Sequence, residues 1–109
     1  MQKNKRARLE AHGWRVGNAA DFLELSAEES ALVDTKLALS GCVRERRSKQ
    51  GLSQAELARR LKSSQSRVAK LEAADPSVST DLLLRALFAL GATPNDVASA
   101  IRRRHRAAA

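Results

Sequence analysis

The chain has 109 residues, in which 20 Lys and Arg against 12 Asp and Glu give a formal charge of +8. Compact domains usually run from about 50 to 250 residues, so this length fits one domain and argues against a two-domain enzyme. The positive balance favours a polyanion, most often nucleic acid, over a membrane surface. Aromatic residues make up only 3%, which argues against folds that stack single-stranded bases on rings.

Cysteine, histidine and apolar runs exclude several kinds of site. Cys42 is the single cysteine, which permits no internal disulfide and no thiolate zinc cluster, so we expect a cytoplasmic protein. His12 and His105 have no acid or cysteine at ligand spacing, and we therefore predict no metal and no cofactor. No apolar run approaches the roughly 20 residues that cross a bilayer, and no membrane role is expected.

The N-terminal part divides into two segments. Residues 1–18 are basic and poor in apolar residues, a composition that predicts a flexible basic tail. Residues 19–35 combine a short apolar stretch with the start of a helix, forming an N-terminal extension. Ser26 is followed three residues later by Glu29, and this capping box marks where the helix begins.

A long helical pattern continues from residue 27 until Gly51, a natural C-terminal stop. Gly41 lies inside it, and an interior glycine costs about 1 kcal/mol relative to alanine. The pattern leaves open whether this segment is one helix or two.

Two short helices are predicted next. Ser53 and Glu56 form a second capping box, which opens a helix of about nine residues. Residues 62–64 interrupt the pattern, and a helix over residues 65–73 follows. It ends before Pro76, because the residue that precedes a proline is pushed out of the helical region.

The last two predicted helices complete an all-α fold of five helices. One runs from about residue 80 to Leu90 and is closed by Gly91. Thr93 and Pro94 open the other, since Thr is a good N-cap and Pro fits the first helical position. We place the domain at residues 36–101 and a basic C-terminal tail at 102–109. The arginines of that tail either grip phosphates or are simply solvated, and the sequence leaves this open.

The middle of the chain resembles a known family. Leu-Ser-Gln-x-x-Leu-Ala, from residue 52, lies before the turn, and Ser-Gln-Ser-x-Val-x-x-Leu-Glu, from residue 64, lies after it. Two short helices joined by about three residues, the second polar on its outer face, are typical of a helix-turn-helix. The segment is similar to that of phage-repressor and Xre-like transcription regulators, and the resemblance covers roughly residues 36–100. It implies a protein that binds double-stranded DNA sequence-specifically.

The resemblance assigns roles to individual residues. Those expected to contact base edges in the major groove are Gln65, Ser66 and Lys70. Those expected to contact phosphate are Ser53, Gln54, Arg67 and Lys62. Gln can pair with adenine and Lys can donate to guanine, which agrees with these roles. Arg47 and Glu72 match a structural ion pair of the family. Lys62 departs from the glycine that usually follows the first helix of the pair.

A second resemblance concerns residues 13–29. Followed by a helix-turn-helix, this segment is similar to small HigA-type antitoxins. That similarity implies a protein that neutralises a basic RelE-like or HigB-like endoribonuclease toxin and represses its own operon as a dimer. Trp14, Phe22 and Leu25 would then contact the toxin, since an apolar segment beside acids suits a basic partner. Alternatively, Phe22 and Leu25 cover the first helix of this same chain.

The function classes that remain are a repressor that is also an antitoxin, a stand-alone or phage-type repressor, and a small basic ribonuclease. The ribonuclease is disfavoured because the chain has no Tyr and both histidines lie in expected tails, so we predict no enzymatic activity. A repressor of this kind is expected to be a homodimer on a two-fold operator. Its candidate dimer residues are Leu84, Phe88, Val97 and Ile101.

Overall fold

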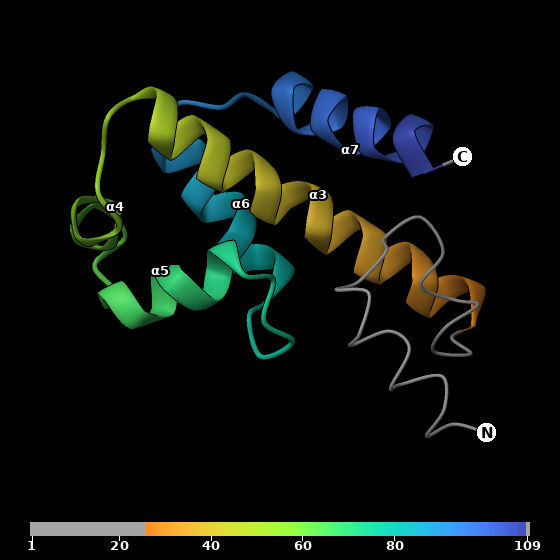
Figure 1. Ribbon diagram of the computed structural model, residues 1–109, viewed down its shortest axis with the longest axis horizontal. Coiled ribbons are helices and arrows are strands. Elements are labelled where there is room, and N and C mark those ends of the chain that lie inside the picture. The colour runs from red at the N-terminus through yellow and green to blue at the C-terminus, as the bar shows by residue number, and fades with distance from the viewer. Residues whose placement is uncertain (1–25, 109) are drawn as a thin grey trace.

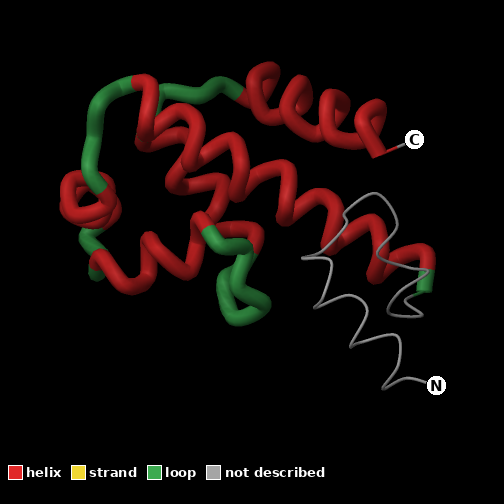
Figure 2. The backbone as a smooth tube through the Cα atoms, viewed as in Figure 1, coloured by secondary structure: helices red, strands yellow, loops and turns green. Residues whose placement is uncertain are grey.

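A computed structural model describes residues 26–108, which form five helices and no strand (Figure 1). The helices are α3 (Ala27–Lys49), α4 (Gln54–Leu61), α5 (Gln65–Glu72), α6 (Thr80–Ala89) and α7 (Pro94–Ala108). Short loops join them, the longest following α5 (Figure 2). The prediction of an all-α, five-helix fold is confirmed.

The long helix α3 is not broken at Gly41. It is one helix of 23 residues, about 34 Å long at 1.5 Å per residue. Leu39 and Val43 are buried on either side of the glycine, and the buried Ser40 hydroxyl donates to the Leu71 carbonyl at 2.8 Å. Packing and this hydrogen bond hold the helix together across Gly41 and outweigh its weak helix propensity.

The predicted capping boxes are present. The backbone N–H of Ser53 donates to the Glu56 carboxylate at 2.8 Å, and the Glu56 N–H donates to the Ser53 hydroxyl at 3.1 Å. These hydrogen bonds hold the pKa of Glu56 below its ordinary value. Thr93 and Asp96 make the equivalent exchange at the start of α7, which lowers the pKa of Asp96. Both carboxylates therefore stay ionised to lower pH than unpaired ones.

Four helices end in one hydrogen-bonding motif. A residue with positive φ follows each of them: Gly51, Lys62, Ala74 and Gly91. At the end of α4, the Ser63 N–H donates to Ala58 and the Lys62 N–H to Arg59, which is the Schellman pattern. Glycine adopts this backbone without strain, whereas Lys62, at φ 54°, does so at a cost.

The core lies where α3 packs against α5, α6 and α7. It is built almost wholly from aliphatic side chains, as the shortage of aromatic residues requires. Its fully buried side chains are Leu39, Val43, Leu57, Val68, Leu71, Leu83 and Leu87. α4 and α5 lie on one side of α3, and α7 lies on the other (Figure 1).

The basic segment that begins at residue 102 is not a tail that follows the last helix. It continues α7 to Ala108. Ala100 is buried, Ile101 packs against the core, and Arg104 lies 3.8 Å from Asp34 of α3. Ile101, Arg104 and His105 of α7 line one hollow with Ala27, Ser30, Ala31, Asp34 and Thr35 of α3, so the end of α7 lies beside the first turns of α3.

Several predictions concern residues that the structure does not describe. The basic tail over residues 1–18 and the toxin contacts expected of Trp14, Phe22 and Leu25 lie outside the described residues. Within 26–108, no helix combines the length and apolar character that crossing a membrane requires.

Candidate nucleic-acid interface

α4 and α5 form a pair of eight-residue helices joined by residues 62–64. α4 is seen end-on in Figure 1 while α5 lies across the view, so their axes cross at a large angle. Leu57 of α4 and both Val68 and Leu71 of α5 are fully buried. The two helices are therefore fixed against each other and against α3 by packing.

The outer face of α5 carries the residues predicted to contact bases. Gln65, Ser66 and Lys70 are all exposed, whereas Val68 and Leu71 point into the core. The buried face of α5 packs on α3, so the polar face is directed away from the body of the molecule. A helix presented in this way can enter a major groove.

Ser64 has a role that the sequence analysis did not assign. It is the N-cap of α5, and its hydroxyl accepts a hydrogen bond from the Arg67 N–H at 3.1 Å. The signal was present in the sequence, since a serine directly before a helical segment is a typical N-cap. This cap fixes the first turn of α5, where Gln65 and Ser66 lie.

Cations surround the polar face of α5. Lys62 and Arg67 are exposed, and so are Arg59 and Arg60 in the last turn of α4. Ser53 caps α4 and is also exposed. Positive charge next to free backbone amides at a helix start suits phosphate oxygens.

The predicted ion pair between Arg47 and Glu72 is present behind α5. The Arg47 Nε donates to Glu72 Oε2, and its Nη2 donates to Oε1 at 3.0 Å. The Glu72 side chain is 5% exposed and that of Arg47 is 16% exposed. The hydrogen bonds to Glu72 raise the pKa of Arg47. The geometry is bidentate, which is the strong form of such a pair.

Glu72 gathers further hydrogen bonds from two other helices. Gln54 of α4 donates from Nε2 to Glu72 Oε1 at 3.2 Å, and Arg44 of α3 donates to the Glu72 carbonyl at 3.4 Å. Arg47 also donates to the Leu52 carbonyl at 2.8 Å. Gln54, predicted as a phosphate contact, is thus half-buried and engaged with Glu72 through its amide, a contact that sequence reasoning missed.

The candidate dimer residues do not share one exposed surface. Leu84, Val97 and Ile101 are partly buried against the core. Phe88 is 48% exposed on α6, and Leu32 is 54% exposed on α3. Of the four candidates, Phe88 alone is a large exposed apolar side chain.

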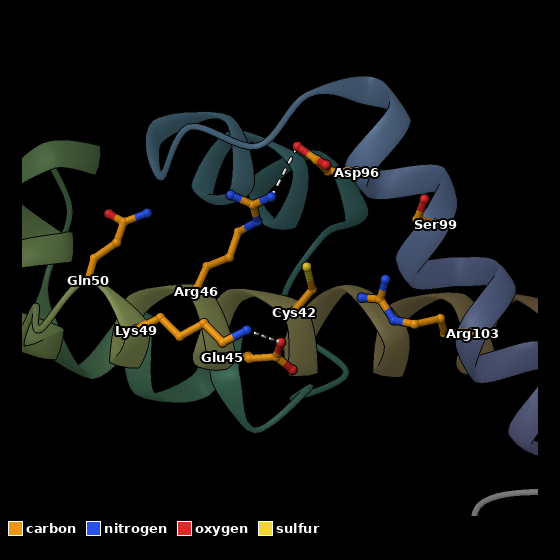
Figure 3. Close-up of a pocket in the computed structure, with 8 residues that line it drawn as sticks. All are labelled: Cys42, Glu45, Arg46, Lys49, Gln50, Asp96, Ser99 and Arg103. Carbon is orange, nitrogen blue, oxygen red and sulfur yellow. Dashed lines mark hydrogen bonds and ion pairs between the residues drawn. The ribbon is translucent and has the colours of Figure 1, made fainter.

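A hollow of about 410 Å³ lies between α3 and α7, away from α5 (Figure 3). Arg46 and Asp96 form an ion pair across it at 3.0 Å, and Lys49 pairs with Glu45 at 3.2 Å. Cys42, half-buried, lies at its base. The acids in the hollow are thus paired with neighbouring cations.

Comparison with protein families supports the geometry of α4 and α5. Residues 38–100 match the sequence model of a family described as a helix-turn-helix domain, and this range is more than half of the chain. The chain belongs to this helix-turn-helix family. Such domains are those of DNA-binding regulators and are typically not enzymes, and the match supports the Xre-like resemblance. No curated protein and no solved structure matches the chain.

Replacing Lys62 with glycine is expected to change stability and DNA affinity in opposite directions. Glycine relieves the left-handed strain in the turn of the helix-turn-helix, stabilising the domain by up to about 1 kcal/mol. Lys62 is predicted to contact phosphate, so loss of its charge is expected to weaken DNA binding and to lower the salt slope by about 0.9. Thermal unfolding and titration of a duplex at several salt concentrations measure the two effects.

Lys62→Gln is the matched control, because it removes the charge and keeps the strain. It should weaken binding without stabilising the domain. Unchanged duplex affinity in both variants would show that Lys62 does not face phosphate.

Proposed function

We propose that the protein is a sequence-specific transcription regulator that places α5 in the major groove of duplex DNA. The observation that carries this proposal is the exposed polar face of Gln65, Ser66 and Lys70 on a helix held rigidly from behind. Arg47 and Glu72 supply that rigidity through their buried, bidentate pair. Cations on both helices of the pair supply charge for the flanking phosphates.

The regulator acts as a homodimeric repressor of its own promoter in this proposal. Two recognition helices about 34 Å apart fit successive major grooves of a two-fold operator. Phe88, at 48% exposure, supports an apolar contact between copies on α6. Phe88→Glu is therefore expected to reduce both dimer mass and operator affinity.

The test is binding to DNA from the protein's own promoter in the presence of excess unrelated duplex. We expect a shifted complex that survives competition at physiological salt, with light scattering giving two chains per operator. Equal competition by the unrelated duplex would overturn sequence specificity, and absence of any complex would overturn DNA binding itself.

A second candidate function is neutralisation of a basic endoribonuclease toxin. The first turns of α3 favour it, because Glu28 and Glu29 are exposed there and Leu32 is 54% exposed. An apolar side chain beside acids is complementary to a basic partner. The residues predicted to contact the toxin, Trp14, Phe22 and Leu25, precede this helix in the sequence.

Purification from the native host with a C-terminal tag tests this candidate. A small basic protein that co-elutes at equal stoichiometry, and whose toxicity this chain suppresses, would support it. A homodimer that elutes alone and still binds its promoter would instead support a stand-alone repressor without a toxin partner.

A further inference from the structure

The outward face of α7 carries a stripe of three arginines. Arg106 follows Arg102 by four residues and Arg103 by three, so the three lie on one side of the helix with Arg102 and Arg103 at its two edges. All three are exposed, although the Arg103 side chain extends over the hollow between α3 and α7 (Figure 3). The opposite face of α7, which includes the buried Ala100 and the half-buried Arg104, packs against α3.

Ion pairs within the described residues do not use this stripe. Arg104, on the inner face, is the α7 arginine that forms an ion pair, with 3.8 Å to Asp34. Arg102 donates to the Ser99 hydroxyl at 3.2 Å, a neutral partner. Among residues 26–108, no salt bridge joins Arg102, Arg103 or Arg106 to an acid.

Stabilisation of the helix end does not account for the whole stripe. Cations in the last turn of a helix offset its dipole, an effect that fades beyond that turn. Arg106 lies in the last turn of α7, but Arg102 and Arg103 lie further from the end of the helix. Neither forms a salt bridge in the described part of the chain, although Arg103 lies near enough to Asp96 to help lower its pKa.

The stripe faces the side of the molecule opposite to the DNA-contacting face of α5. α3 runs between α5 and α7 (Figure 1). α5 and α7 pack on different sides of α3 (Figure 1), and the polar residues of α5 and the arginines Arg102 and Arg106 of α7 are exposed. A straight duplex lying against α5 therefore cannot reach the stripe.

We propose that this arginine stripe binds the phosphates of a second stretch of duplex DNA, so that the protein bridges two DNA segments. The proposal rests on the proposed function, because α5 must hold the first duplex. Exposed guanidinium groups on one helix face suit phosphate oxygens and give binding without sequence preference. The second contact is thus nonspecific, whereas the first is specific.

A capture experiment tests the bridge with the full chain. Promoter duplex is fixed to beads, protein is bound to saturation, and a labelled unrelated duplex is then added and the retained label measured. The test variant is R102Q/R103Q/R106Q, which removes the charges and keeps good helix formers. The control variant is K49Q/R85Q, which removes exposed cations that have acid partners at 3.2 Å in each case.

We expect the test variant to lose at least tenfold in captured duplex while its affinity for the promoter duplex alone changes less than threefold. Capture by the wild-type protein should also fall more steeply with salt concentration than the residual capture by the test variant. The slope of log capture against log salt should differ by about 2 to 3, since each phosphate contact contributes about 0.9. The control variant, and R102K/R103K/R106K, should capture as the wild type does. Light scattering and thermal unfolding check that assembly and fold are unchanged.

Two results would overturn the bridge while leaving the proposed function intact. One is promoter binding by the wild type without capture of a second duplex. The other is equal capture by the wild type and R102Q/R103Q/R106Q. Failure of the wild type to bind promoter duplex at all would instead refute the proposed function.

Discussion

Replacing the buried Glu72 with alanine is expected to destabilise the domain by about 3 to 5 kcal/mol, because it leaves the partly buried Arg47 guanidinium without its partner. The Glu72 side chain is 5% exposed, and it also accepts from Gln54 at 3.2 Å. Loss of the Glu72 carboxylate therefore removes the hydrogen bonds that join α5 to α3 and to α4. Urea unfolding followed by circular dichroism measures the loss.

A double variant and a surface control separate burial from general charge effects. Arg47→Met with Glu72→Leu removes both charges, and it should be much more stable than Glu72→Ala alone. Glu45→Ala breaks the exposed pair with Lys49, and it should change stability by about 0.5 kcal/mol or less. A loss below 1 kcal/mol in Glu72→Ala would show that the pair does not fix α5.

The second large effect is expected in DNA recognition. Gln65→Ala and Lys70→Ala should each lower discrimination between the operator and a mutated site by about 1 to 3 kcal/mol, roughly 5- to 150-fold, which is the range for one good base contact. Both side chains are exposed on the outer face of α5, so neither change should alter the fold. Paired affinities for operator and mutated duplex measure the discrimination.

Arg67→Gln provides the control, since the loss of a phosphate contact weakens all duplexes alike. It should lower affinity for both sites by a similar factor and preserve their ratio. If Gln65→Ala and Lys70→Ala also preserve the ratio, the recognition surface lies elsewhere.

Much of the fold could be predicted because its signals are local. Serine followed by an acid three residues later marked the start of α3 and of α4, and both boxes are present. Glycine marked the ends of α3 and α6 through its positive φ. These features depend on neighbouring residues alone, so a single sequence contains them.

The remaining features depend on contacts between distant residues. Gly41 stays helical because Ser40 reaches Leu71, 31 positions away. Gln54 turns to Glu72 because α4 and α5 cross, and periodicity gives no hint of that crossing. α7 continues past Ile101 because the early turns of α3 lie beneath it. The Arg47–Glu72 pair was found through the family resemblance, since no local rule joins residues 25 positions apart.

The hydrogen bonds that meet at Glu72 also bear on how the protein would adapt to DNA. One carboxylate joins α3, α4 and α5, so α5 cannot tilt or rotate without breaking buried contacts. Docking would therefore require little loss of protein conformational entropy. Because α5 is fixed in this way, the duplex would have to bend or twist to match the helix. The deformability of base pairs that no side chain touches would then contribute to the choice of binding site.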